Sequence, residues 1–345
     1  MSEGRVSWQP PTAPFSGLSV VVGAPLTHCI EKGGLLRGTA GGVFNAILRS
    51  ANIDREAISV HSVFETQLAQ DSMAKHRVFL GDNWGPEYAG CVARLADEIN
   101  AVNPHVIVPM GDLAAFALAG NAHVTQMRGA PILGCGPFEK RKLVPTLETR
   151  EVMRMWKMYA VVIGDFVKAM SEVAKGPKLR YPDVALTIAP SMKEVDAYLQ
   201  GCLNAELLSV DIETGWGMIR GISFSYSPEH AIYIPFIDLS KPTKSYWPDA
   251  KTEAQVWRAV KGVLECPVPK LGQNFDGYDI HWLLQKMGIR VRNMCHDLRL
   301  LHHAVYAELP KSLAFMASAY SSLPGWKHWA DHGGAKKHRA GKRDE

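Results

Sequence analysis

The 345-residue sequence lacks several features that mark membrane, secreted or metal-cluster proteins. It contains no run of about eighteen apolar residues, which a transmembrane helix needs, and its N-terminus lacks the charged and apolar regions of a signal peptide. Its six cysteines form no C-x-x-C pair, which argues against a zinc ribbon or a cysteine-ligated iron–sulfur cluster. We therefore expect a cytoplasmic protein with reduced thiols, without zinc and without membrane association.

The sequence also lacks a strong charge imbalance. Its formal net charge of +4 is too small to establish a nucleic-acid partner. Positive charge is concentrated at residues 336–343, whose lysine and arginine side chains could contact phosphate groups. We favour the alternative that residues 331–345 form a solvated, disordered tail.

Length and composition predict two globular domains. Hydrophobic residues make up 47% of the sequence and charged residues 21%, which is ordinary for a globular protein of this size. We expect an irregular, proline-containing lead-in at residues 1–17, a first domain at 18–174, a linker at 175–184 and a second domain at 185–330.

Strands and helices alternate along the first domain. The segments that predict them are residues 18–22, 58–64 and 105–111 for strands, and 43–48, 88–102 and 112–118 for helices. Such alternation is typical of a parallel sheet with helices on both faces. The glycines at residues 38–42 match neither a P-loop nor a dinucleotide fingerprint, so they do not support a nucleotide cofactor.

Four motifs of this domain, in order, resemble the uracil-DNA glycosylase superfamily, especially its thermophilic and phage-type branches. They are Gly-Ala-Pro at residues 23–25 and the segments 36–41, 104–112 and 127–131. The resemblance implies a three-layer α/β/α domain with a DNA-binding groove. It also implies a pocket formed by five residues, Gly23, Ala24, Pro25, His28 and Arg128.

The catalytic positions of that superfamily differ in this sequence. Where its members carry a histidine after Pro-Thr, the sequence reads Leu147-Glu148. His28 or Glu31 could act on a flipped base, and the alternative is that both are solvated loop residues. The resemblance therefore implies the fold and the groove more than the activity.

Two carboxylates follow the apolar run at residues 207–210. The period-2 geometry of a strand places Asp211 and Glu213 on one face and Ile212 on the other. A lone Asp-x-Glu is mostly a solvated strand end, but two carboxylates on one edge suggest a divalent cation. Residues 221–236 predict a hairpin beside this strand and hence a mixed sheet.

Three motifs in order resemble the 3′–5′ proofreading exonuclease domain of family A DNA polymerases, within the DnaQ-like ribonuclease H superfamily. They are Asp-Ile-Glu-Thr at residues 211–214, Gly-Gln-Asn-Phe-x-x-Tyr-Asp at 272–279, and Leu-Pro-Lys-Ser-Leu-Ala-Phe-Met-Ala-Ser-x-Tyr at 309–320. The resemblance implies a mixed-sheet α/β fold. It also implies that Asp211, Glu213 and Asp279 are catalytic and bind two Mg²⁺ or Mn²⁺ ions.

The same resemblance suggests contacts with DNA. Thr214 and Asn274 belong to its motifs, and Phe275 is the favoured candidate for stacking on a base of a frayed strand end, with a place in the core as the alternative. Members of this family complete the site with a tyrosine and an aspartate four residues apart on a later helix. That motif has no match after Tyr320, although Asp331 or a separate polypeptide could replace it.

Together, these resemblances predict a DNA-processing protein of phage or mobile-element type. We expect a metal-dependent 3′–5′ exonuclease fused to a glycosylase-like DNA-binding domain, acting in replication or repair in a bacterial or phage-infected cell. Its substrate would be single-stranded or frayed 3′ ends, and a separate DNA polymerase could be its partner. One alternative is an inactive or weakened DNA-binding or polymerase-accessory module. A second alternative is excision of uracil or damaged bases by the first domain.

Overall fold

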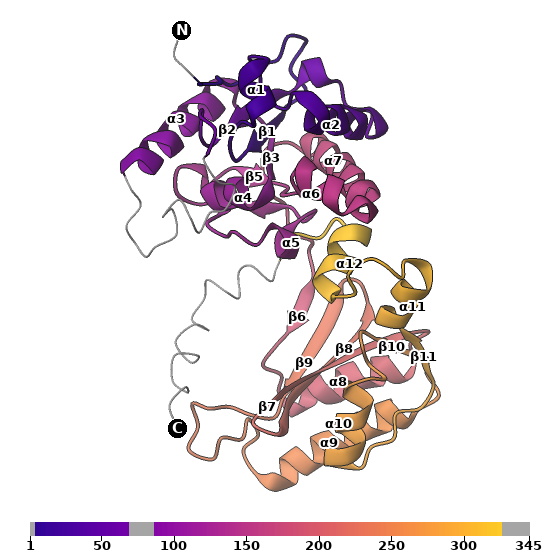
Figure 1. Ribbon diagram of the computed structural model, residues 1–345. Helices are drawn as coiled ribbons and strands as arrows, with labels where there is room; N and C mark the ends of the chain where they lie inside the picture. Colours follow the sequence, from indigo (N-terminus) through magenta and orange to yellow (C-terminus); the bar gives the residue numbers. More distant parts are fainter. Residues whose placement is uncertain (1–3, 69–85, 326–345) are drawn as a thin grey trace, which may run out of the picture. The chain divides into compact units, whose positions relative to one another are not determined.

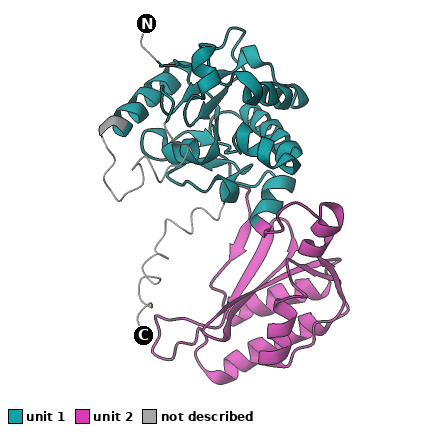
Figure 2. Ribbon diagram, viewed as in Figure 1, with its two compact units in different colours: residues 1–181, 314–345 teal, residues 182–313 magenta. Residues whose placement is uncertain are grey.

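The computed structural model describes residues 4–68 and 86–325, which form two compact units (Figure 2). Unit 1 comprises residues 1–181 and 314–345, and unit 2 comprises residues 182–313. The chain leaves unit 1 inside the segment 175–184 that the sequence suggests as a linker. The second domain expected at residues 185–330 differs from unit 2 in its C-terminal boundary, because the chain rejoins unit 1 at Ala314.

The chain returns to unit 1 at helix α12 (Leu313–Tyr320). Two basic side chains of unit 1 hold this helix: Arg128 Nη1 donates to Ser318 Oγ at 3.2 Å, and Lys168 Nζ donates to the Ser318 carbonyl oxygen. Phe315 lies against the guanidinium of Arg128, 5.0 Å from ring centroid to carbon. The suggested tail at 331–345 lies outside the described residues.

The sheet of unit 1 has five strands in the order β2-β1-β3-β5-β4. Their bounds are β1 Leu18–Val22, β2 Ser59–Ser62, β3 Val106–Met110, β4 Ile132–Leu133 and β5 Lys142–Leu143. The first three are parallel and completely buried, as expected of apolar runs covered on both faces. Only β4 runs antiparallel to its neighbour within this described sheet.

Helices lie on both sides of this sheet. Their bounds are α1 Thr27–Glu31, α2 Gly38–Ser50, α3 Pro86–Val102, α4 Gly111–Ala119, α5 Val124–Met127, α6 Thr149–Arg154 and α7 Tyr159–Ala174. Figure 1 shows α3 on one side of the strands and α2 with α7 on the other. Unit 1 is therefore an α/β/α unit with a mainly parallel sheet. Among the described helices of the chain, none is both long and apolar enough to cross a membrane.

Unit 2 contains a six-stranded mixed sheet in the order β11-β10-β7-β8-β9-β6. The bounds are β6 Ala185–Thr187, β7 Leu208–Gly215, β8 Met218–Ser227, β9 His230–Pro235, β10 Lys270–Gly272 and β11 Met294–Asp297. The strands β7, β8 and β9 form an antiparallel meander, and β10 and β11 run parallel to β7. Counted from β7, the strands are ordered 3-2-1-4-5, with β6 beside the third. This is the mixed-sheet ribonuclease H-like arrangement that the sequence predicts.

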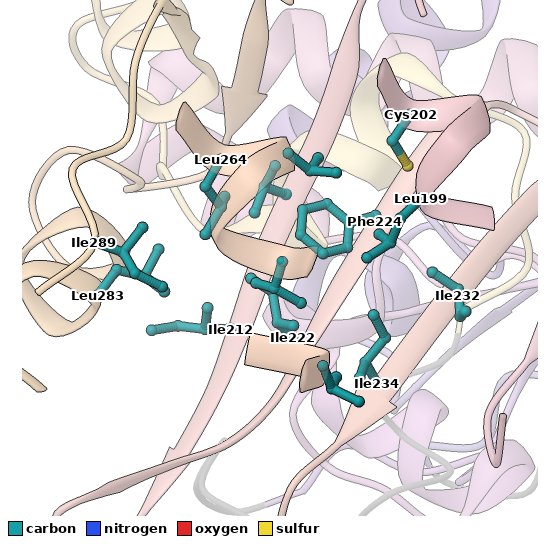
Figure 3. Close-up of a cluster of buried hydrophobic side chains, with 14 of the residues drawn as sticks. Leu199, Cys202, Ile212, Ile222, Phe224, Ile232, Ile234, Leu264, Leu283 and Ile289 are labelled. Atoms are coloured by element: carbon teal, nitrogen blue, oxygen red, sulfur yellow. The ribbon is translucent and has the colours of Figure 1, made fainter. Parts of the chain in front are cut away.

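One face of the unit 2 sheet carries the hydrophobic core (Figure 3). The helices are α8 Met192–Leu203, α9 Ala250–Glu265, α10 Asp279–Met287 and α11 Leu298–Val305. Ile222 and Phe224 of β8 are covered by Leu199 of α8 and Leu264 of α9, all at most 2% exposed. Leu283 of α10 belongs to the same cluster, so the core positions the start of α10 against the sheet.

Candidate metal and nucleic-acid site

Strand β7 carries the first two carboxylates. Its buried residues alternate with exposed ones, so Asp211 and Glu213 are exposed whereas Ile212 is buried. Asp211 pairs with Ser223 of β8, and Glu213 pairs with Gly221. The antiparallel pairing thus fixes both carboxylates on the strand face away from Ile212, as the period-2 pattern predicts.

The third carboxylate comes from the first residue of α10. Asp279 is 4% exposed, and its Oδ1 accepts a hydrogen bond from the amide N–H of Ile212 at 2.9 Å. Burial raises the pKa of Asp279 to about 7, and the negative charges of Asp211 and Asp297 act in the same direction. The bond to Ile212 opposes that rise. Asp279 is therefore held beside the strand segment that carries Asp211 and Glu213.

A fourth carboxylate, Asp297, organises the loop before α10. It caps α11: its Oδ1 accepts from the amide of Arg299 at 2.8 Å and from that of Asn274 at 3.0 Å. Its Oδ2 accepts from the amide of Asp276 at 3.3 Å. Asp297 is not among the site residues predicted from the sequence, although an aspartate directly before a helical run is an N-cap signal.

Thr214 and Asn274, suggested as DNA contacts, already have partners within unit 2. Thr214 Oγ1 and the exposed Tyr278 hydroxyl lie 2.6 Å apart. Asn274 has a positive φ of 57°, and its Oδ1 accepts from Arg299 Nη1 at 2.5 Å. Thr214 lies in β7 directly after Glu213, and Asn274 lies in the segment between β10 and α10.

The structure corrects the suggested role of Phe275. Its side chain is 0% exposed and belongs to the hydrophobic core, so it cannot stack on a base without unfolding its surroundings. A Cβ at Gly272 would lie 2.7 Å from Phe275, so the glycine leaves the space that the ring fills. Phe275 therefore packs in the hydrophobic core and anchors the loop before α10.

A further candidate residue, which no local sequence pattern indicates, is Tyr233 of β9. It pairs with Ser223, the β8 partner of Asp211. A Cβ at Gly221, the β8 partner of Glu213, would lie 2.3 Å from the Tyr233 hydroxyl oxygen, so the phenol lies across β8 at that point. Burial raises the pKa of Tyr233 and the Glu213 carboxylate contributes, while Arg220 lowers it. A glycine within a strand signals such a close approach, but not its partner.

The donor chemistry of Asp211, Glu213 and Asp279 fits Mg²⁺ or Mn²⁺, since hard divalent cations prefer carboxylate oxygen. Within residues 4–68 and 86–325, no three His, Cys, Asp or Glu side chains are gathered as a ready metal site. Asp279 is fixed by Ile212, whereas the two strand carboxylates are exposed. Asp331, the suggested replacement for the missing ligand, lies outside the described residues.

The suggested pocket of unit 1 is only partly assembled. Gly23, Ala24 and Pro25 form the turn after β1, and His28 follows in α1. His28 Nδ1 lies 2.9 Å from Glu31 Oε2, and both side chains are more than half exposed.

Arg128, by contrast, is not a pocket residue. Its side chain is buried, its Nε donates to Asp165 Oδ2 at 2.9 Å, and its Nη2 donates to Asp165 Oδ1. Thr146 Oγ1 donates to the same carboxylate at 2.7 Å. Because Asp165, Ser318 and Phe315 surround the guanidinium, Arg128 stabilises the fold and has no group left to read a base.

No protein-family model matches the chain, and no curated protein matches it. Among solved structures, the catalytic core of RRP6 from Trypanosoma brucei is similar at 18% identity and a TM-score of 0.32, covering 41% of this chain and 36% of that one. The Nibbler EXO domain from Aedes aegypti is similar at 17% identity and a TM-score of 0.28, covering 38% and 61%. RNase D from Escherichia coli is similar at 16% identity and a TM-score of 0.31, covering 44% and 36%.

The chain covers less than two thirds of each of these three chains. The fold of unit 2 is therefore assigned from its own strand order and register.

Proposed function

We propose that the chain is a divalent-metal-dependent 3′–5′ exonuclease that uses Asp211, Glu213 and Asp279 of unit 2. The observation that carries this proposal is the hydrogen bond from the Ile212 amide to Asp279. It ties a buried carboxyl of α10 to the strand segment between two exposed carboxylates. A buried acid next to like charges is costly unless a cation or a proton compensates it.

Each residue has a part in this proposal. Mg²⁺ or Mn²⁺, when bound, would stabilise charge on the phosphate and lower the pKa of a water molecule. Asp211 and Glu213 would bind the cation through their exposed carboxylates. Asp279, the first residue of α10, would be a third carboxylate ligand of the same cation. Water would then add to the phosphorus while the 3′ oxygen leaves and takes up a proton, releasing a nucleoside 5′-monophosphate.

Tyr233 and the Thr214–Tyr278 pair would contact the strand end. All three carry hydroxyl groups, which can donate hydrogen bonds to phosphate oxygens. We propose single-stranded or frayed DNA 3′ ends as the substrate, with RNA as the competing substrate. A role in replication or repair beside a separate DNA polymerase belongs to the same proposal.

The test is the shortening of 5′-labelled single-stranded DNA and RNA oligonucleotides in Mg²⁺ or Mn²⁺. We expect a ladder that shortens from the 3′ end, disappears in EDTA and is lost in Asp211→Asn. Asp196→Asn is the matched control, because Asp196 lies on the exposed side of α8. An intact oligonucleotide at every metal concentration, or equal rates in Asp211→Asn and the wild type, would contradict the proposal.

The second candidate function is base excision by unit 1, and the His28–Glu31 contact favours it. A glutamate that accepts from Nδ1–H orients the imidazole and leaves Nε2 as the proton acceptor. This pair follows β1, at the strand ends where open α/β sheets bind ligands. Alkali-labile sites in a uracil-containing oligonucleotide, absent in His28→Ala, would support it; an unchanged oligonucleotide would count against it.

A further inference from the structure

Unit 1 contains a cavity of about 710 Å³ between the lead-in at residues 8–12, helix α2 and the segment 53–58. Its deeper wall is apolar, since Leu48, Ile53 and Ile58 are at most 6% exposed. The lead-in wall is held in place by two backbone hydrogen bonds between Gln9 and Val60, at 2.7 and 2.9 Å. The cavity is therefore built from ordered elements. Its lining does not include the turn at residues 23–25 or His28.

Three arginines line this cavity: Arg37, Arg49 and Arg55. Among the residues that the structure describes, none of these guanidinium groups forms an ion pair with a carboxylate. Arg55 is half-buried; burial lowers its pKa, the positive charge of Arg37 lowers it further, and the nearby Glu56 carboxylate opposes the shift. An anion placed near both groups would relieve this repulsion.

The two carboxylates of the cavity wall are already engaged. Asp54 caps the short helix at Arg55–Ala57 by accepting from the Glu56 amide at 3.0 Å. Glu56 accepts from the Thr12 hydroxyl and so closes the lead-in onto that helix. Arg55 is oriented by Gln9, whose Oε1 accepts from Nη2 at 2.7 Å. These bonds hold the wall and leave the guanidinium groups of Arg37 and Arg49, and the N–H groups of Arg55 other than the one bound to Gln9, for a ligand.

The cavity also has an aromatic wall, Trp8. Its ring is stacked on His61, with centroids 4.9 Å apart and planes 7° from parallel. His61 is itself held by Glu98 and Ser59, both at 3.0 Å, so the indole rests on a rigid support. A rigid aromatic ring beside guanidinium groups is the combination that binds bases by stacking and phosphates by hydrogen bonds.

We propose that this cavity binds a nucleotide, either a free mononucleotide or one unit of a nucleic-acid strand. Arg37 and Arg55 hold its phosphate, Arg49 contacts it from the rim, and the base lies along Trp8. The site belongs to unit 1 and uses no metal, so it does not rest on the exonuclease reaction proposed for unit 2.

Calorimetric titration of the full chain in EDTA tests this site, because EDTA removes metal-dependent binding. The probes are inorganic phosphate, deoxyadenosine monophosphate and a single-stranded DNA pentanucleotide. We expect Arg37→Ala/Arg55→Ala to weaken nucleotide binding at least tenfold, and the exposed Arg154→Ala in α6 to change it less than twofold. Equal affinity for the monophosphate and the pentanucleotide identifies a free nucleotide site. Tighter binding of the pentanucleotide identifies a strand site.

Two results would overturn the proposal. One is the absence of binding of all three probes to the wild type at millimolar concentration. The other is unchanged binding in a folded double variant, verified by its thermal unfolding. If the double variant does not fold, Arg37→Glu replaces it, because Arg37 is exposed; a Kd within twofold of the wild type in that variant also overturns the proposal.

Discussion

The carboxyl of Asp279 accepts the amide N–H of Ile212 at 2.9 Å, so a helix residue is fastened to the strand between Asp211 and Glu213. Asparagine can accept the same bond but carries no negative charge. We therefore expect Asp279→Asn to lower nuclease activity at least about a hundredfold. The midpoint of urea unfolding should stay at or above that of the wild type, because a buried like charge is removed. Activity near that of the wild type would remove Asp279 from the site.

The phenol of Tyr233 lies across Gly221, the β8 residue that pairs with Glu213. If its hydroxyl binds a phosphate oxygen, Tyr233→Phe should raise KM several-fold, because one hydrogen bond contributes about 1 kcal/mol. Gly221→Ala should have a larger effect, since the new Cβ would lie 2.3 Å from the phenol and displace it. Steady-state kinetics on a labelled oligonucleotide would show this order, and an unchanged KM in both variants would contradict it.

The Arg128–Asp165 pair predicts a stability effect without an effect on chemistry. Arg128→Ala removes the ion-paired guanidinium from buried Asp165 and leaves only the less direct charge of Lys168 near it, which costs about 3–5 kcal/mol. The double variant Arg128→Met/Asp165→Leu removes both charges and should recover much of that loss. Urea unfolding of both variants measures the difference. A single variant within about 1 kcal/mol of the wild type would mean that the pair is not buried in solution.

Lys168 predicts a pH dependence of stability. Burial lowers its pKa to about 8, against 10.5 for an ordinary lysine, although Asp165 opposes the shift. Between these two values the unfolded chain binds more protons than the folded one, so the free energy of unfolding rises with pH in that window. We expect this rise to be roughly 1–2 kcal/mol larger in the wild type than in Lys168→Met, allowing for partial solvation. Urea unfolding at pH 7.5, 9 and 10 tests it, and parallel pH profiles would refute it.

Local patterns were sufficient to predict much of this structure. The apolar run at 18–22 is strand β1, and the predicted hairpin is β8 with β9. The alternation around Asp211 predicts which side chains of β7 are exposed, because a strand has only two faces. The glycine at 288 ends α10 in the left-handed conformation, at a φ of 62°.

Relationships between distant residues could not be predicted in this way. The local sequence around an aromatic residue in a loop does not show whether its ring faces solvent or the core. The ring of Phe275 is buried because Gly272, which has no side chain, leaves room for it. The return of α12 to unit 1 depends on Arg128 and Asp165, far away in the sequence. Tyr233 reaches the neighbourhood of Glu213 only through the register of β7, β8 and β9.

The most direct test of the central claim is a measurement of Mn²⁺ binding to the full chain. Binding is monitored as the decrease in the electron paramagnetic resonance signal of free Mn²⁺. The three carboxylates should bind the ion together, so we expect Asp211→Asn, Glu213→Gln and Asp279→Asn each to weaken binding at least tenfold. Asp196→Asn should bind as the wild type does. Equal Mn²⁺ affinity in the wild type and all three site variants would contradict the assignment of these carboxylates as a metal site.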